Sequence, residues 1–158
     1  MIFVTVGAQM PFDRLIRAVD DWAQAGAATK IFAQIGVGAW QPQHIPYAEM
    51  LPPSEFERRV RECTLMVAHA GIGSIFAAMN ARKPLLVMPR RASLRETRNE
   101  HQLATVKHFE PYGVAAAMDE RELQQKLAHH ETIPAPQALA PTASPRLLAA
   151  LRAFVEAS

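Results

Sequence analysis

A glycine-containing turn between an apolar run and a predicted helix constrains the fold of this chain most strongly. Leu65–Ala68 predicts a buried strand, the turn follows over His69–Ser74 with the sequence HAGIGS, and Ser74–Ala81 predicts a helix. Glycine lets a backbone approach a ligand closely, and the first turn of a helix leaves N–H groups that attract anions. The turn therefore predicts either an anion-binding site or a tight structural turn, and the rest of the chain favours the first.

Short apolar runs alternate with amphipathic segments along most of the chain. The pattern predicts strands at 2–6, 30–35, 45–50, 65–68, 84–88 and 114–117, and helices that include 74–81 and 98–109. Helix caps are expected at Asp13, at Ser54 in a capping box with Glu57, and at Asp119 with Glu122. This alternation predicts a single α/β domain of the doubly wound, Rossmann-like type with a mostly parallel sheet.

Proline residues separate the last predicted helix from this domain. Residues 1–131 form the predicted domain, and residues 132–144 are rich in proline and predict a linker. Residues 145–158 predict an amphipathic C-terminal helix. The apolar stripe of that helix leaves two roles open, because it can cover its own sheet or dock a partner.

Length and composition place the chain among globular proteins. Its 158 residues, 49% hydrophobic and 20% charged, are enough for one packed domain. It has no apolar run of about 18 residues that would predict a membrane span. Met1–Gly7 predicts a first strand rather than a signal peptide. The single cysteine, Cys63, is expected to be a buried thiol, which fits a reducing cytoplasm.

Basic residues gather in one segment. Six of them lie from Arg82 to Arg98 against the single acid Glu96, although the formal net charge is only +2. The segment surrounds the predicted strand 84–88, so its loop is expected at the same sheet edge as the glycine turn. This position favours an anionic ligand over a solvated loop. A nucleic-acid partner is disfavoured, because the net charge is near zero and few aromatic residues lie among the basic ones.

Several motifs occur in the order found in MurG-like glycosyltransferases. Gly7 after the first strand, the HAGIGS turn, Lys83–Arg90 and Asn99–Gln102 resemble the C-terminal, donor-binding domain of that family. The likeness covers about residues 1–128. It is strongest to the free-standing form of the domain, in particular to PssE-like small subunits of bacterial exopolysaccharide glycosyltransferases. The resemblance implies half of a two-domain GT-B fold.

The resemblance also assigns roles in binding a UDP-sugar. The glycine turn is expected to hold the pyrophosphate through the N–H groups of Gly71–Ser74 and the Ser74 hydroxyl. Pro89 and Arg90 are expected beside the uracil and ribose. The complete set of predicted donor-binding residues is Gly7, His69, Ala70, Gly71, Ile72, Gly73, Ser74, Pro89, Arg90, Arg91, Arg98, Glu100, His101 and Gln102.

Some of these residues have a structural alternative. His69 is expected to orient the turn or reach a phosphate, and it can equally be a half-buried histidine bonded to backbone. Residues 100–102 are expected beside the sugar hydroxyls, and they can equally form a solvated first turn of a helix. MurG holds the ribose with a glutamate where this chain has Ala77, so Glu96, Glu100 or a partner is expected to replace it.

The resemblance implies a reaction without a metal or a cofactor, with the UDP-sugar as substrate. The chain has no Asp-x-Asp motif, so the helix dipole and basic side chains are expected to stabilise the departing pyrophosphate. The catalytic base of such enzymes belongs to the acceptor-binding half. No residue of this chain is therefore assigned as catalytic.

The expected function is that of the donor-binding subunit of a two-component glycosyltransferase in exopolysaccharide synthesis. A membrane-anchored subunit would present the polyprenyl-pyrophosphate-linked acceptor, which would hold this chain at the cytoplasmic face of the membrane. UDP-glucuronic acid is a candidate donor, because Arg90, Arg91 or Arg95 can pair a sugar carboxylate. Alone, the chain is expected to self-associate as a homodimer. The alternative is a nucleotide-binding regulatory or scaffold protein without transferase activity.

Overall fold

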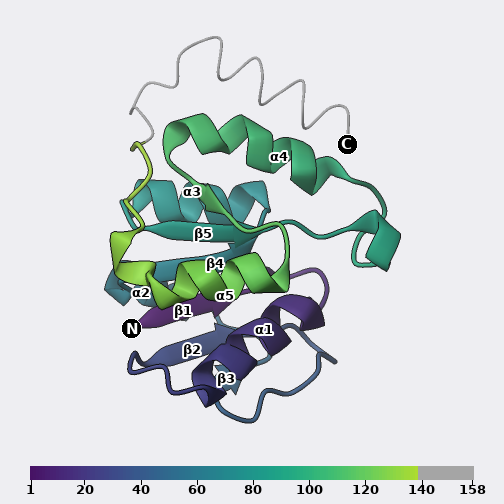
Figure 1. Ribbon diagram of the computed structural model, residues 1–158, viewed down its shortest axis with the longest axis vertical. Coiled ribbons are helices and arrows are strands. Elements are labelled where there is room, and N and C mark those ends of the chain that lie inside the picture. Colours follow the sequence, from purple (N-terminus) through teal and green to yellow (C-terminus); the bar gives the residue numbers. More distant parts are fainter. Residues whose placement is uncertain (139–158) are drawn as a thin grey trace.

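The computed structural model describes residues 1–138 and shows a six-stranded sheet in which every pairing is parallel (Figure 1). The strand order is β3-β2-β1-β4-β5-β6. The strands are β1 Ile2–Thr5, β2 Ile31–Gln34, β3 Tyr47–Ala48, β4 Leu65–His69, β5 Leu85–Met88 and β6 Ala115–Ala116. The predicted doubly wound α/β domain is confirmed. The last predicted helix and residues 139–144 of the predicted linker lie outside the described residues.

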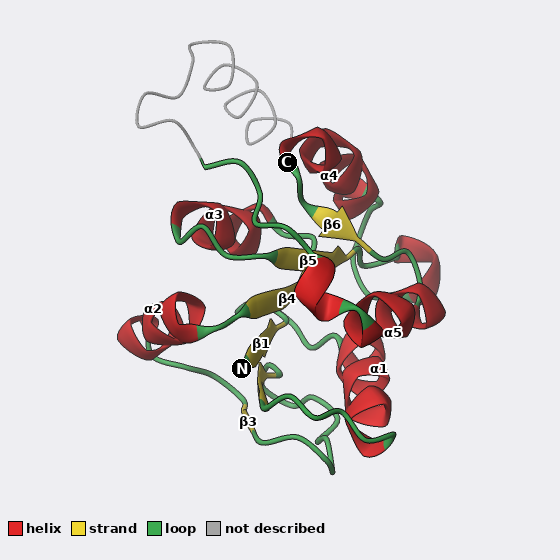
Figure 2. Ribbon diagram, turned by 60° about the vertical axis from the view of Figure 1, so that its left-hand side comes forward, coloured by secondary structure: helices red, strands yellow, loops and turns green. Residues whose placement is uncertain are grey.

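Helices cover both faces of the sheet (Figure 2). They are α1 Asp13–Gln24, α2 Pro53–Glu62, α3 Ile72–Asn80, α4 His101–Phe109 and α5 Glu120–Ala128, with short 3₁₀ turns at Ala92–Leu94, Glu110–Tyr112 and His130–Thr132. Helices α1 and α5 pack on the face that carries Ile2 and Val4, and α2, α3 and α4 pack on the face that carries Phe3. Because successive strand residues point to opposite faces, a strand buried on both must be apolar throughout.

The strand order places a switch point between β1 and β4. The chain leaves β1 toward β2 and β3, and then returns to add β4 on the other side of β1. At such a point two loops diverge at the carboxyl edge of the sheet and leave a crevice. Thr5 of β1 pairs with Ala68 of β4. The loop that begins near Gly7 and the glycine turn at His69 therefore emerge side by side.

Two of the three predicted helix caps are wrong. Helix α1 begins at Asp13 with Phe12 as N-cap, and the Asp13 carboxylate accepts the N–H of Trp40 at 3.1 Å instead. Helix α2 begins at Pro53, so Ser54 already lies inside the helix and forms no capping box. A proline at the first helical position has its φ already set and starts the helix earlier. The cap at Asp119 is confirmed by its bond from the Glu122 N–H at 2.8 Å.

The remaining differences from the predicted elements are small. Helix α3 begins two residues before Ser74, and α4 begins at His101 rather than at Arg98. Cys63 directly follows α2 and is buried as predicted, and this burial raises the pKa of its thiol. No helix within residues 1–138 has the length and apolar character needed to cross a membrane.

Candidate functional site

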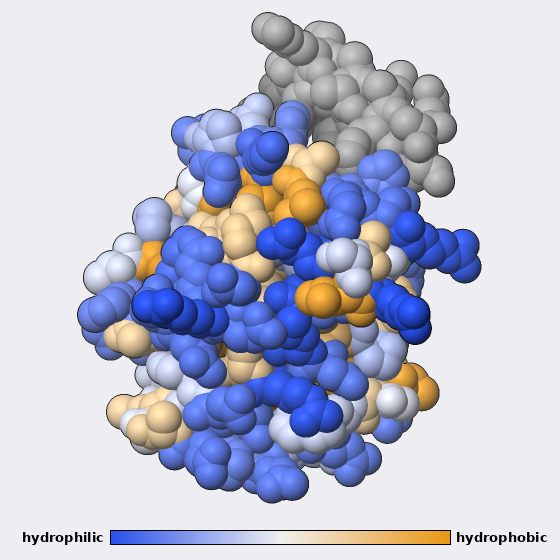
Figure 3. Space-filling view, turned by 45° about the vertical axis from the view of Figure 1, so that its right-hand side comes forward, coloured by the Kyte–Doolittle hydropathy of each residue, from blue (hydrophilic) through white to orange (hydrophobic). Residues whose placement is uncertain are grey.

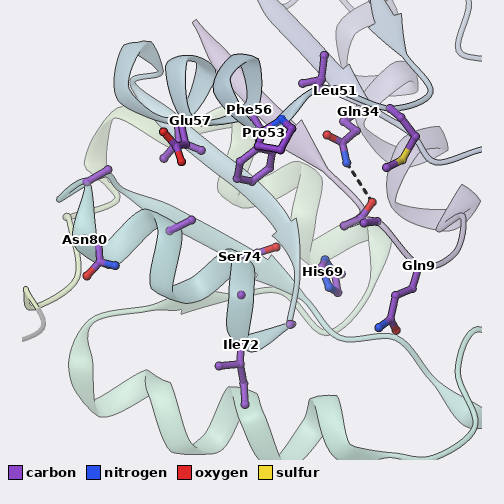
Figure 4. A pocket seen from close by; sticks show the side chains of 18 of the residues that line it. Gln9, Gln34, Leu51, Pro53, Phe56, Glu57, His69, Ile72, Ser74 and Asn80 are labelled. Carbon is purple, nitrogen blue, oxygen red and sulfur yellow. Dashed lines mark hydrogen bonds between the residues drawn. The ribbon is translucent and has the colours of Figure 1, made fainter. Parts of the chain in front are cut away.

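A pocket of about 990 Å³ opens at the switch point (Figure 4). Its floor comes from the loops after β1 and β4, and its walls come from α2 and α3. Ligand pockets for molecules of moderate size have volumes of about 300–1,000 Å³. The pocket therefore lies where a doubly wound fold binds its ligand, and it is large enough for a nucleotide.

The N-terminus of α3 supplies anion-binding groups to this pocket. Gly71 is the N-cap, and the first helical bond runs from the Ile75 N–H to the Gly71 carbonyl at 3.1 Å. The N–H groups of Ile72, Gly73 and Ser74 therefore have no acceptor within the helix. One expectation needs correction, because the Gly71 N–H donates to the His69 carbonyl at 2.8 Å and is not free for a phosphate.

His69 fills the space between the two glycine-containing loops. A Cβ atom at Gly71 would lie 2.1 Å from its Nε2, and one at Gly7 would lie 2.7 Å from its Cε1. Burial and the nearby Arg90 charge lower the pKa of His69 to about 4, so the ring is neutral at pH 7. The neutral imidazole thus acts as a packed spacer that fixes the distance between the loops.

Gly7 has a backbone conformation that favours glycine. Its φ is +79°, and its N–H donates to the Thr5 hydroxyl at 3.1 Å. Its carbonyl accepts the side-chain N–H of Gln34 at 3.1 Å, shown as the dashed line in Figure 4. Gln34 is 4% exposed at the end of β2, so a buried amide holds this loop in place at the pocket floor.

The wall opposite the glycine turn is mainly apolar. Leu51 precedes α2, and Pro53, Phe56 and Val60 lie on the face of α2 that borders the pocket. Flat apolar surfaces of this kind pack well against an aromatic ring. The pocket therefore combines backbone anion-binding groups with a surface that suits a nucleobase.

The family of this chain follows from its sequence. Residues 1–150 match the model of the glycosyltransferase family 28 C-terminal domain.

The chain belongs to this family.

Solved structures with the same fold include both larger and similar-sized proteins. A glycosyltransferase of kitacinnamycin superimposes with a TM-score of 0.63 at 16% identity, over 99% of this chain and 39% of that one. The solution structure of ALG13 superimposes with a TM-score of 0.59 at 21% identity, over 98% of this chain and 94% of that one. VinC in complex with dTDP gives 0.51 at 17% identity, over 98% and 36%. No functionally curated protein matches the chain by sequence.

The predicted donor-binding residues of this family 28 domain fall into two groups. Those that line the pocket are Gly7, His69, Gly71, Ile72, Gly73, Ser74 and Gln102. Those that do not line it are Ala70, Pro89, Arg90, Arg91, Arg98, Glu100 and His101. The first group surrounds the switch point, and the second belongs mainly to the loop between β5 and α4. Contacts with a donor stay a prediction for both groups.

The sequence predicts Arg90 as a ligand-binding residue, and the structure gives its side chain a role in stabilising the fold. Its side chain is 3% exposed, and its guanidinium donates to the carbonyls of Val6 at 3.0 Å, Met10 at 2.6 Å and Pro11 at 2.5 Å. It also lies 4.7 Å from the centre of the Phe12 ring. The Arg90 side chain therefore stabilises the loop after β1, and its charge is not directed into the pocket.

Two acidic side chains form hydrogen bonds and ion pairs that stabilise the rest of the basic loop. Glu96 accepts from Arg14 of α1 at 2.7 Å and from the Arg91 N–H at 2.9 Å. Glu100 accepts from the N–H groups of Ala92 and Ser93 at 2.9 Å and 3.3 Å. Both carboxylates are thus engaged outside the pocket lining, which disfavours them as replacements for the ribose-binding glutamate.

Gln102 connects this loop to the pocket. Its Oε1 accepts the Arg90 N–H at 2.9 Å, and its side chain belongs to the pocket lining. Ala77 also lines the pocket, one helical turn after Ser74. Among residues 1–138, no group of three His, Cys, Asp or Glu side chains gathers in a way that could hold a metal ion.

Proposed function

We propose that this chain is the donor-binding subunit of a glycosyltransferase and that it holds a UDP-sugar in the pocket at the switch point. The observation that carries the proposal is the start of α3, where the N–H groups of Ile72, Gly73 and Ser74 face a pocket of nucleotide size. Membership of a glycosyltransferase family supports the reaction class. The dTDP bound to VinC supports a nucleoside diphosphate as the ligand class.

The chemistry of this half of the reaction is mainly positioning and charge stabilisation. A diphosphate at the N-terminus of α3 would gain hydrogen bonds from free N–H groups and favourable interaction with the helix dipole. The same groups would stabilise the charge that develops on the departing diphosphate during transfer. The apolar wall around Leu51 and Phe56 would hold the base, so the sugar would point toward the open side of the pocket.

A second protein half is proposed to close the pocket and bring the acceptor. Large apolar side chains with high exposure in residues 1–138 are Met10, Val37, Met50 and Leu94. Each lies in a loop that follows a strand at the carboxyl edge of the sheet. Figure 3 shows small hydrophobic areas set among hydrophilic ones on the face in view. Met50 also lines the pocket, and exposed apolar residues at this edge of the sheet suit contact with another protein surface.

The finer parts of the proposal concern the partner and the sugar. The chain spans 39% of the kitacinnamycin glycosyltransferase but 94% of the ALG13 structure, which supports a free-standing donor half. We propose a membrane-anchored partner that presents a polyprenyl-pyrophosphate-linked acceptor, with this chain at the cytoplasmic face and acting in exopolysaccharide synthesis. With Arg90 buried, a carboxylate of UDP-glucuronic acid would be paired by Arg91, Arg95 or the partner.

A transfer assay with the partner tests this function. The chain is co-expressed with a candidate membrane-anchored partner, and membranes are incubated with a set of UDP-sugars and the polyprenyl-linked acceptor. Transfer that requires both chains supports the proposal. Binding of UDP without transfer or donor hydrolysis for any sugar favours the regulatory alternative, and absence of UDP binding overturns the proposal.

A further inference from the structure

Glu57 is the acidic residue among those that line the pocket. It lies on α2, one residue after Phe56 of the apolar wall. Figure 4 shows it on the same side of the pocket as Asn80 of α3. Helices α2 and α3 pack against each other, so side chains from both can reach one bound molecule.

The carboxylate of Glu57 is weakly engaged compared with its neighbours. Its ion pair is with Arg61, at 3.6 Å and with both side chains more than 60% exposed. Glu55 on the same helix bonds to Arg58 at 2.6 Å and Arg59 at 2.8 Å, and Glu62 bonds to Arg58 at 2.7 Å. An exposed pair at 3.6 Å contributes little, so a ligand can take the Glu57 oxygens at low cost.

Glu57 borders the part of the pocket that also contains Asn80, near the far end of α3 from Ser74. One helical turn advances about 5.4 Å, so a group one turn beyond a diphosphate at Ser74 would lie over Ala77. The methyl group of Ala77 offers no hydrogen bond there. The polar side chains that border this region are Glu57 and Arg61 on α2, and Asn80 one turn further along α3.

We infer that Glu57 accepts hydrogen bonds from the ribose 2′- and 3′-hydroxyls of the bound nucleotide, and that it selects a ribonucleotide donor over a deoxyribonucleotide. The inference rests on the proposed function. An ionised carboxylate has two oxygens and accepts from two adjacent hydroxyl groups. Glu96 and Glu100 are engaged outside the pocket, which leaves Glu57 for this role. The fold does not fix the choice of nucleotide, because VinC was solved with dTDP.

The test compares the affinities of UDP and 2′-deoxy-UDP for the full chain by titration calorimetry. Wild-type protein is expected to bind UDP about tenfold more tightly, the value of one charge-assisted hydrogen bond. Glu57→Gln is expected to reduce this ratio to about twofold, because it weakens the binding of UDP more than that of 2′-deoxy-UDP, which keeps only the 3′-hydroxyl. Glu62→Gln is the matched control, because it also removes one ion pair of α2 but lies outside the pocket lining, and it should keep the wild-type ratio.

The outcomes separate this inference from the function on which it rests. If UDP binds and 2′-deoxy-UDP binds equally well, or if Glu57→Gln keeps the wild-type ratio, the role of Glu57 is overturned and the proposed function stands. If wild-type protein binds neither nucleotide, both are overturned. Thermal unfolding of the two variants should match wild type, because both side chains are largely exposed.

Discussion

Replacing Gly71 with alanine places a methyl group where the His69 ring lies. The new Cβ would be 2.1 Å from Nε2 of His69, well inside van der Waals contact. The ring is part-buried between Gly71 and Gly7, where an added Cβ would be 2.7 Å from Cε1. The backbone of Gly71, with φ −93° and ψ 139°, suits alanine, so the cost comes from contact alone. We expect the free energy of unfolding to fall by about 2–3 kcal/mol.

Gly73→Ala is the matched control for this substitution. No atom lies within 4 Å of a Cβ built at Gly73, which is also in the first turn of α3. Alanine has less conformational freedom in the unfolded chain and is a better helix former. The control should therefore be neutral or raise the free energy of unfolding by up to about 1 kcal/mol. Urea unfolding followed by far-ultraviolet circular dichroism measures both variants.

A double-mutant cycle with His69→Ala identifies the cause of the loss. If the ring opposes the new methyl group, Gly71→Ala should cost less than about 0.5 kcal/mol once the ring is removed. An equal cost in both backgrounds would refute the reasoning, and so would an equal cost for Gly71→Ala and Gly73→Ala. Either result would mean that the imidazole does not act as a spacer between the two loops.

Three further predictions concern the same site. Because His69 has an ordinary pKa of 6.5 and a folded pKa of about 4, the unfolded chain binds more protons between these values. The free energy of unfolding should therefore fall as the pH falls from 6.5 to 4, and a pH series of urea titrations on His69→Asn should lack this part of the slope. Arg90→Lys should lower the free energy of unfolding by about 2–4 kcal/mol, because an ammonium group cannot reach three carbonyls as a guanidinium does. The control Arg98→Lys, at an exposed position, should change it by no more than about 0.5 kcal/mol, and equal losses for the two variants would contradict the role of Arg90. Gly73→Val should fold but bind no UDP in calorimetry, since its side chain fills the space above the free N–H groups, and unchanged affinity would exclude this phosphate site.

The fold could be predicted from sequence because its signals are local and repeated. Runs such as Leu65–Ala68 are apolar at every position, which is typical of strands buried on both faces, and each is followed by a helical period. The start of α2 was misplaced because Ser54 and Glu57 match a capping box, although Pro52 and Pro53 fix the backbone earlier. Local preference for a proline start outweighed the side-chain pattern.

Part of the pocket lining was predicted, and the differences between prediction and structure have a common cause. The glycine turn can be recognised from sequence because glycines directly after a strand have few roles other than forming a tight turn or a ligand-binding loop. The Leu51 and Phe56 wall was missed because an apolar residue on an amphipathic helix is indistinguishable from core in one sequence. Arg90 was assigned to a ligand because the sequence does not show the carbonyls of Val6, Met10 and Pro11 that surround it.

The central claim is that the N-terminus of α3 binds the diphosphate of a nucleotide, and amide chemical shifts test it most directly. A ¹⁵N-labelled chain is titrated with UDP, and uridine serves as the control without phosphates. The account predicts downfield shifts at the amides of Ile72, Gly73 and Ser74 with UDP and no such shifts with uridine. Saturable UDP binding that leaves these amides unchanged, or that instead shifts residues around Lys30 and Arg59, which line another pocket of about 390 Å³, would contradict it.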